Sequence, residues 1–283
     1  MAKTWSTEPA QSLRVREGWS LADVDPASTP GFEGSKKYGQ QVLEAGAEQL
    51  SDLQEKLFAS SRAAGDTRNV LLVLQAMDTA GKGGIVRHVV GAVDPQGVHH
   101  HAFKRPTEEE LAHDFLWRIR NQLPGVGMIG VFDRSHYEDV LVGKVRELAP
   151  LDEIEKRYGD IVEFENELAA SGTTIVKVML HISFEEQKAR LAERLDRPDK
   201  FWKFNPGDID ERNLWADYQN AYEIALQRTS TDGAPWFVVP ADRKWYARVA
   251  VQKLVIDALR GLDLAWPPAD FDVDLQKTRL AVS

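Results

Sequence analysis

One glycine-rich stretch of the sequence combines the residue types that bind phosphate. It runs from Ala76 to Gly84 with the sequence AMDTAGKGG, and it directly follows the apolar run Asn69–Gln75. Glycines let the backbone curl so that successive N–H groups face phosphate oxygens, and a helix that starts here adds a favourable dipole. Lys82 can reach the terminal phosphates as a point charge. The stretch predicts a phosphate-binding loop whose contacts are Lys82 and the backbone of Ala80, Gly81, Gly83 and Gly84.

The loop departs from the usual phosphate-loop motif at two positions. Ala76 stands in place of the first glycine, and Gly83 stands in place of the serine or threonine whose hydroxyl binds Mg²⁺. Another group must then hold the metal. Asp78 is the candidate, because an acid beside phosphates is repulsive unless a cation lies between them. The alternative interpretation is a tight turn that binds no ligand.

A second acidic motif, VFDRSHYED, lies at the end of another apolar run, Gly127–Phe132. An aspartate that ends a buried strand is the usual second Mg²⁺ position in a protein with a phosphate loop. The carboxyl ends of parallel strands meet at one edge of the sheet. We therefore expect Asp133 to hold Mg²⁺ together with Asp78, and Arg134 to neutralise charge on the transferring phosphoryl group. Asp133 is also placed to cap the following helix, a role that does not exclude metal binding.

The elements that position these residues alternate along the chain. Apolar runs typical of buried strands lie at 69–75, 98–103, 127–132, 173–182 and 236–239. Helical patterns lie at 38–64, 82–93, 107–123, 136–146, 152–170, 184–194, 210–229 and 243–262. Strands that alternate with helices predict the α/β class, with a parallel sheet of about five strands wrapped by helices. Together with the phosphate loop, this pattern predicts a P-loop kinase-like three-layer sandwich.

The chain is expected to divide into an arm, a domain and a tail. Residues 1–36 contain several prolines and glycines and form an extended N-terminal arm. Residues 37–265 form the P-loop kinase-like domain, and residues 266–283 form an irregular C-terminal tail. A stretch rich in proline, charge and aromatics predicts a helical lid within the domain at about residues 194–215.

Composition restricts the class of protein. The chain has 283 residues, of which 43% are hydrophobic and 28% charged, as in ordinary globular domains. A net charge of −9 disfavours binding to nucleic acid, so a polyanionic substrate needs cations gathered locally. The absence of cysteine excludes disulfides, and no apolar run approaches the ~20 residues of a membrane span. We expect a soluble cytoplasmic protein that binds neither nucleic acid nor membrane.

Four motifs, in order along the chain, resemble those of the family-2 polyphosphate kinases. LQAMDTAGKGG at Leu74–Gly84 and FDRSHYEDVLV at Phe132–Val142 are similar to the two signature motifs of that family. FKRPTEEELAHDFLWR at Phe103–Arg118 resembles its F-x-x-P-T-x-x-E segment, and RLDRPDKFWKFNPGD at Arg194–Asp208 resembles its lid. The similarity extends over residues 30–265, nearly the whole chain.

The resemblance implies phosphoryl transfer between inorganic polyphosphate and a nucleotide, with Mg²⁺ or alternatively Mn²⁺. ADP or AMP is the expected nucleotide, with GDP as an alternative, in a reversible reaction of a homodimer or homotetramer. The residues implied in the reaction are Asp78, Lys82, Asp133 and Arg134, with both aspartates on the metal. Lid residues implied in substrate binding are Arg194, Arg197, Lys200 and Lys203. Many members have asparagine where this chain has Asp133, so this metal site is more acidic.

Further side chains are candidates for substrate contact. A polyphosphate chain needs a basic track, and Lys104 is the best candidate because it lies at a strand end. Arg120 is expected to be a solvated helix residue. Trp202, between two lysines, is placed either to stack on a nucleobase or to cover the core.

Two other functions remain open from the sequence. One is an ATP-dependent nucleotide or small-molecule kinase on the same fold, because the fold alone does not determine which compound donates the phosphoryl group. The other is a nucleotide sensor without catalysis, although binding alone does not require two acids and a lysine. Product formation with polyphosphate in the absence of ATP distinguishes all three.

Overall fold

A parallel β-sheet forms the centre of the molecule. The computed structural model describes residues 4–283, and the first three residues of the predicted arm lie outside this range. The strands are β1 Asn69–Ala76, β2 Val98–Ala102, β3 Ile129–Asp133, β4 Thr173–His181 and β5 Trp236–Pro240. They lie in the order β2-β3-β1-β4-β5, with every neighbouring pair parallel. The predicted five-stranded parallel sheet is confirmed.

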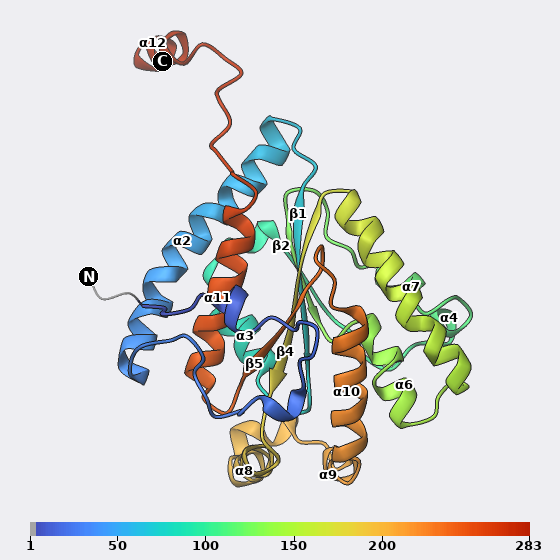
Figure 1. The fold of residues 1–283 in the computed structure, drawn as a ribbon. Coiled ribbons are helices and arrows are strands. Elements are labelled where there is room, and N and C mark those ends of the chain that lie inside the picture. The colour runs from blue at the N-terminus through green and yellow to red at the C-terminus, as the bar shows by residue number, and fades with distance from the viewer. Residues whose placement is uncertain (1–3) are drawn as a thin grey trace.

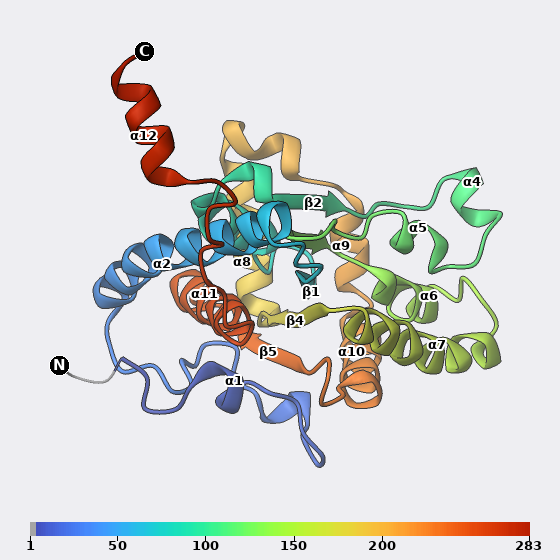
Figure 2. The same ribbon diagram turned by 90° about the horizontal axis from the view of Figure 1, so that it is seen from above.

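Helices cover both faces of this sheet, which gives three layers (Figures 1 and 2). One face is covered by α2 (Lys36–Ala63), α3 (Lys82–His88) and α11 (Lys244–Arg260). The other face is covered by α6 (Val142–Val145), α7 (Leu151–Ala170) and α10 (Trp215–Thr229). Figure 1 shows α8 (Phe184–Asp196) and α9 (Gly207–Arg212) below the end of the sheet where the strands finish. The three-layer α/β sandwich predicted from the sequence is confirmed.

β1 is the central strand because its side chains are apolar on both faces. The side chains from Val70 to Leu74 have no solvent-exposed surface, as expected for a strand covered by helices on both sides. Leu74 pairs with Asp133 in the register of β1 and β3. The sheet therefore brings the phosphate loop and the second acidic motif to the same edge.

The N-terminal segment packs along the body of the protein before α2 begins. It contains α1 (Pro9–Ser12) and a 3₁₀ helix at Leu21–Asp23. It also buries Trp5 and Phe32, whose ring centroids lie 5.0 Å apart. Nearby, the N–H of Val15 donates to the carbonyl of Trp236 in β5 (2.9 Å). This segment therefore contributes to the core.

Several predicted helices are interrupted in the structure. The helix expected at 107–123 is divided into α4 (Glu108–Leu111) and α5 (Trp117–Arg120). Asp114 accepts a hydrogen bond from the N–H of Leu116 (3.0 Å), which forms a turn between the two. The helices expected at 82–93, 136–146 and 210–229 are also broken, by 3₁₀ segments at 90–92 and 136–139 and by a turn at 213–214.

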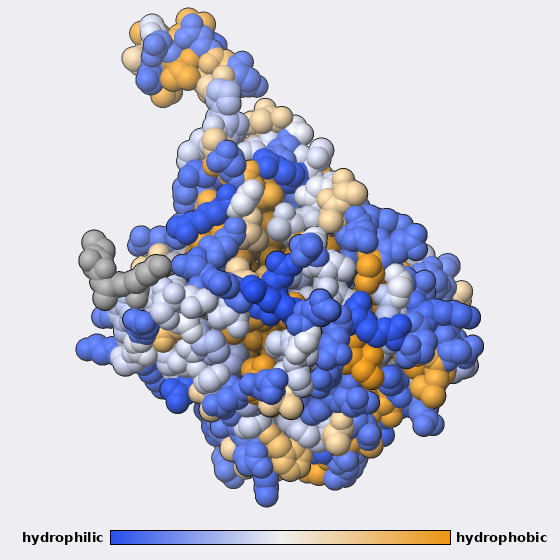
Figure 3. Space-filling model, viewed as in Figure 1, coloured by the Kyte–Doolittle hydropathy of each residue, from blue (hydrophilic) through white to orange (hydrophobic). Residues whose placement is uncertain are grey.

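The predicted irregular tail is wrong for its last part, which forms α12 (Val273–Ala281). Asp272 caps this helix by accepting a hydrogen bond from the N–H of Leu275 (2.9 Å). Figures 1 and 3 show α12 projecting from the body at the end opposite α8 and α9, with apolar residues on its surface. Within residues 4–283, no helix has both the length and the apolar character required to cross a membrane.

Candidate active site

The phosphate loop has the curled backbone that its glycines predicted. Thr79 and Gly81 have positive φ angles of 66° and 124°, and the second value favours glycine. The N–H of Ala80 donates to Met77 O (3.2 Å), and the N–H of Gly84 donates to Gly81 O (2.8 Å). Among the described residues, the backbone N–H groups of 81, 82 and 83 have no backbone acceptor. Within the same described range, the N–H groups of 78 and 79 likewise have no backbone acceptor, so the loop presents several N–H groups to an anion.

The carbonyl side of the loop is held by two residues of α8 that sequence reasoning missed. The buried guanidinium of Arg190 donates to Thr79 O (3.0 Å) and Ala80 O (2.9 Å). Gln187 Nε2 donates to the main-chain oxygen of Asp78 (3.0 Å). The only sequence signal was two polar residues, three positions apart, on the face of α8 that is buried. Because side chains of α8 bind the carbonyl oxygens of the loop, the opposite side of the loop remains available to phosphate.

Arg134 lies among the acidic side chains of both motifs. Its Nη2 is 3.2 Å from Asp78 Oδ1, and its Nε is 4.0 Å from Glu138 Oε2. Burial by itself would lower the pKa of Arg134, but the carboxylates of Glu138, Asp78 and Asp133 raise it above its ordinary value. These acids therefore converge on one guanidinium. Arg134 also has a φ of 65°, a left-handed conformation that turns the chain sharply where β3 ends.

Asp78 and Asp133 suit a hard divalent cation. Mg²⁺ is normally bound by one or two carboxylates, with substrate phosphates and water completing its octahedron. Within residues 4–283, no group of three or more histidine, cysteine or acidic side chains is arranged to hold a metal. A cation here would consequently need oxygens from the substrate. This donor set is the one that a phosphoryl-transfer enzyme uses.

Lys82 and Lys104, the two lysines predicted to contact substrate outside the lid, lie on different elements, at the start of α3 and after β2. Lys82 Nζ donates to the carbonyl of Ala76 (3.1 Å), so the side chain folds back across the loop. Lys104 follows β2 and is exposed, and its carbonyl accepts a hydrogen bond from Arg118 Nη1 (2.9 Å). Arg120 is half-exposed and pairs with Glu167 (3.0 Å), as expected for a solvated helix residue.

The predicted lid contains a 3₁₀ helix, Pro198–Lys203, and α9. Its cations are paired with lid acids rather than directed at the phosphate loop: Arg194 with Asp208 (3.3 Å), Arg197 with Asp199 (2.8 Å) and Lys200 with Glu193 (2.6 Å). Hydrogen bonding from Lys200 and the charge of Lys244 lower the pKa of Glu193 to about 2. Lys203 lies 4.8 Å from the ring of Trp202.

The exposure of Trp202 decides between the two positions expected for its ring. Trp202 is 77% exposed, so it does not cover the core. Asp208, the partner of Arg194, has its pKa raised by burial and by the charge of Asp78.

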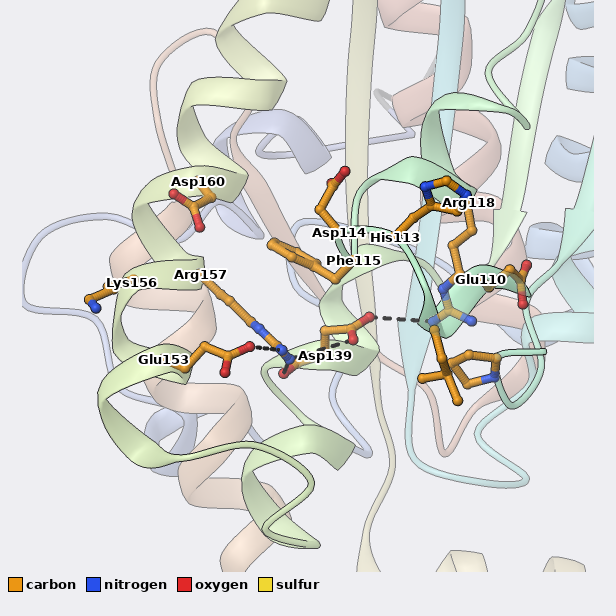
Figure 4. Close-up of a pocket in the computed structure, with 12 residues that line it drawn as sticks. Glu110, His113, Asp114, Phe115, Arg118, Asp139, Glu153, Lys156, Arg157 and Asp160 are labelled. Carbon is orange, nitrogen blue, oxygen red and sulfur yellow. Dashed lines mark hydrogen bonds and ion pairs between the residues drawn. The ribbon is translucent and has the colours of Figure 1, made fainter. Parts of the chain in front are cut away.

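A cavity of about 360 Å³ lies beside the second acidic motif (Figure 4). Its two arginines pair with its acids: Asp139 lies 3.3 Å from Arg118 and 3.6 Å from Arg157, which also pairs with Glu153. Arg118 is thus a buried residue held by an ion pair. The cavity also contains Phe115. A cavity with polar side chains and an aromatic ring in its wall suits a ligand that carries hydrogen-bonding groups and a ring.

Comparison with known proteins agrees with the motifs and the fold. A family model described as Polyphosphate kinase 2 (PPK2) matches residues 34–265. The chain is 47% identical to the AMP/ADP-polyphosphate phosphotransferase of Meiothermus ruber, over 88% of this chain and 91% of that protein. It is 43% identical to the ADP-polyphosphate phosphotransferase of Rhodopseudomonas palustris, over 91% of this chain and 92% of that protein.

A solved structure shows the same likeness in three dimensions. The crystal structure of polyphosphate kinase 2 from Arthrobacter aurescens TC1 superposes with a TM-score of 0.97 at 57% sequence identity. The match covers 100% of this chain and 99% of the other. With a family match across most of its length and relatives of this identity, the chain belongs to the polyphosphate kinase 2 family and is a phosphotransferase.

Proposed function

We propose that this enzyme transfers a phosphoryl group between inorganic polyphosphate and a nucleoside mono- or diphosphate, reversibly and with Mg²⁺. The observation that carries the proposal is the ion pair of Asp78 with Arg134, which directly follows Asp133 at the end of β3, beside a loop with free N–H groups. The names of the relatives from Meiothermus and Rhodopseudomonas support polyphosphate and adenine nucleotides as substrates.

The residues of the chain supply positioning and charge. Backbone N–H groups of the loop hold the donor phosphates, and Lys82 and Arg134 stabilise negative charge on the transferring group. Asp78 and Asp133 would hold Mg²⁺, which polarises the reacting phosphate when bound. The acceptor is a phosphate oxygen that is already ionised at neutral pH, so the protein needs no strong general base.

The cavity of Figure 4 is the proposed position of the acceptor nucleoside. Hydrogen-bonding side chains and Phe115 line it, and the second acidic motif ends at Asp139 in its wall. A nucleoside offers a ring for packing and polar edges for hydrogen bonds. Phe115→Ala should therefore raise the KM for nucleotide and leave the KM for polyphosphate nearly constant. AMP and ADP are the expected acceptors, with GDP as an alternative.

The decisive assay uses the full chain with polyphosphate, Mg²⁺ and one nucleotide at a time, in the absence of ATP. The expected products are ADP from AMP and ATP from ADP, separated by chromatography, and none when Mg²⁺ is chelated. Phosphorylation that occurs only after ATP is added would identify an ATP-dependent kinase instead. Nucleotide binding without product in a single turnover would identify a sensor.

We further expect the enzyme to act in the cytoplasm as a homodimer or homotetramer. Mn²⁺ should substitute for Mg²⁺, because carboxylate, phosphate and water oxygens suit both ions. Light scattering of the purified chain tests the oligomeric state, and metal replacement in the same assay tests the ion.

A further inference from the structure

The guanidinium of Arg190 joins two loops at the edge of the sheet where the strands end. Its Nη1 donates to the main-chain oxygens of Thr79 (3.0 Å) and Ala80 (2.9 Å) in the phosphate loop. Its Nη2 donates to the main-chain oxygens of Ala241 (2.6 Å) and Asp242 (3.0 Å), which lie in the turn between β5 and α11. Arg190 is therefore a bridge between two segments that are remote in the sequence.

This guanidinium has no donor left for a substrate. An arginine side chain has five N–H donors. Nε of Arg190 donates to Glu186 Oε1 (2.7 Å), and with the four main-chain oxygens this gives every donor an acceptor. The side chain is also buried. Arg190 therefore differs from Lys82 and Arg134, which are proposed to contact phosphate, and acts on the loop alone.

The turn after β5 is held in place by hydrogen bonds of its own. The N–H of Ala241 donates to His181 O (2.8 Å) at the end of β4, and the N–H of Asp242 donates to Pro26 O (3.1 Å). Asp242 Oδ1 accepts from the N–H of Ser183 (2.8 Å). The bridge thus connects the phosphate loop to a turn that three other parts of the chain fix.

The phosphate loop needs such support because its backbone is strained at Thr79. The φ angle of Thr79 is 66°, in the left-handed region that a β-branched residue rarely adopts. Its Oγ1 is buried and has no hydrogen-bond partner among the described residues, so the side chain does not offset the strain. A strained conformation persists only where its surroundings hold it. The hydrogen bond from Arg190 acts on the carbonyl of this same residue.

We propose that Arg190 is a positioning residue that holds the strained phosphate loop in its anion-binding conformation before the substrate arrives. The proposal rests on the proposed function, because it concerns the loop that holds the donor phosphates. Without Arg190, the carbonyls of Thr79 and Ala80 lose their partner, and the backbone at Thr79 can relax. The N–H groups of the loop then no longer face a single anion.

This role predicts a particular kinetic pattern. When only a fraction of the molecules has the competent loop, the apparent affinity for polyphosphate falls by that fraction. Saturating polyphosphate selects the competent loop again, so the rate at saturation is kept. A group that stabilises the transferring phosphoryl would lower kcat instead.

The test compares Arg190→Lys and Arg190→Gln with the wild type in steady-state assays. Lysine keeps the charge, but its donors lie on one nitrogen and cannot serve both loops. The KM for polyphosphate should rise roughly tenfold in Arg190→Lys and roughly a hundredfold in Arg190→Gln, which corresponds to losing one and two charge-assisted hydrogen bonds. At saturating polyphosphate, kcat and the KM for nucleotide should stay within about twofold of the wild type.

Relief of the strain provides an independent measurement. Glycine adopts a positive φ without steric cost, so a loop with Thr79→Gly depends less on its support. Added to Arg190→Lys, this substitution should recover part of the lost affinity for polyphosphate. A double variant with the same or a higher KM for polyphosphate would show that Arg190 does not act by holding the strained residue.

Arg68→Gln is the matched control, because Arg68 also joins two segments but lies at the opposite edge of the sheet. Arg68 Nη1 donates to Leu262 O (2.6 Å), and its Nη2 pairs with Asp66 (2.6 Å), just before β1. Arg68→Gln should lower the temperature of thermal unfolding and keep the wild-type KM for polyphosphate.

Three results would overturn the proposal. They are a lower kcat at an unchanged KM for polyphosphate, a loss of thermal stability with wild-type kinetics, and wild-type kinetics for Arg190→Lys. Arg190→Lys decides the question if Arg190→Gln does not fold. Failure of the proposed function is a separate result, since the wild-type enzyme would then give no product from polyphosphate.

Discussion

Gln187 Nε2 donates a hydrogen bond of 3.0 Å to the main-chain oxygen of Asp78, and this bond joins the phosphate loop to α8. The amide oxygen of Gln187 accepts a bond of 2.6 Å from Arg212, the last residue of α9. Arg212 also donates to Phe184 O (3.0 Å) and lies over the Phe184 ring. A chain of direct contacts thus runs from α9 through α8 to the residue proposed to bind Mg²⁺.

Gln187→Leu should lower kcat by roughly three- to tenfold, the effect of one neutral hydrogen bond. The side chain keeps its approximate volume but no longer fixes the Asp78 carbonyl or Arg212. Because Asp78 is then less well placed, the Mg²⁺ concentration that gives half-maximal rate should rise as well. Steady-state kinetics over a Mg²⁺ series measures both quantities. Lys188→Gln, on the exposed side of the same helix, serves as control, and identical kinetics for both variants would remove Gln187 from the positioning of the loop.

The two aspartates should differ in importance. Asp78→Asn should lower turnover by about two powers of ten or more, the scale of losing one electrostatic stabiliser. Asp133→Asn should lower turnover less, because many family-2 polyphosphate kinases have asparagine at this position. The amide oxygen of asparagine can still approach a cation. Turnover of the two variants at saturating Mg²⁺ is the comparison to make. Near-normal turnover of a folded Asp78→Asn enzyme would exclude Asp78 from the mechanism.

The sequence was sufficient to predict the parts of the site that lie within one loop or at one strand end. Asp78, Lys82, Asp133 and Arg134 each follow an apolar run, and such runs identify buried strands. The support from Gln187 and Arg190 could not be predicted, because their partners lie about a hundred residues away in the sequence.

The basic cavity between the first turns of α2 and α11 escaped prediction for the same physical reason. Lys36 begins one helix, and Arg243, Lys244 and Arg248 belong to the start of another, so only tertiary packing brings them together. The split of the helix at 107–123 had a different cause. There the side chain of Asp114 competes for a backbone N–H, and such local competition overrides the helical period.

A buried ion pair contacts Tyr137 of the second acidic motif. Lys177 Nζ lies 2.5 Å from Glu165 Oε2 and 3.0 Å from Tyr137 Oη, and all three side chains are fully buried. Lys177→Met should lower the free energy of unfolding by about 3–5 kcal/mol, because it leaves the carboxylate of Glu165 buried without its partner. Denaturant unfolding at neutral pH measures the loss.

The exposed pair of Arg120 and Glu167 provides the control for this experiment. Both side chains are about half exposed, so Arg120→Ala should cost about 0–1 kcal/mol. The double variant Lys177→Met/Glu165→Leu should recover part of the loss, since it leaves no buried charge at this position. A loss for Lys177→Met no larger than that for Arg120→Ala would show that the buried pair contributes little.

His181 should make the stability of the protein depend on pH. It ends β4, and its Nδ1 is buried without a hydrogen-bond partner among the described residues. Burial lowers the pKa of His181 from 6.5 to about 4, against the opposing charges of Asp242 and Asp25. Between these two values, the unfolded chain binds a proton that the folded chain does not. The free energy of unfolding should therefore fall as the pH falls from about 6.5 towards about 4.

The size of this effect can be isolated with one substitution. Unfolding by urea at about pH 7 and about pH 5 should differ by about 2 kcal/mol more in the wild type than in His181→Gln. The subtraction removes the contribution of carboxylates, which both proteins share. The variant has no titrating group at this position, so its remaining pH dependence is that of the other residues. Equal pH dependence in the two proteins would mean that His181 binds its proton equally well in the folded and unfolded states.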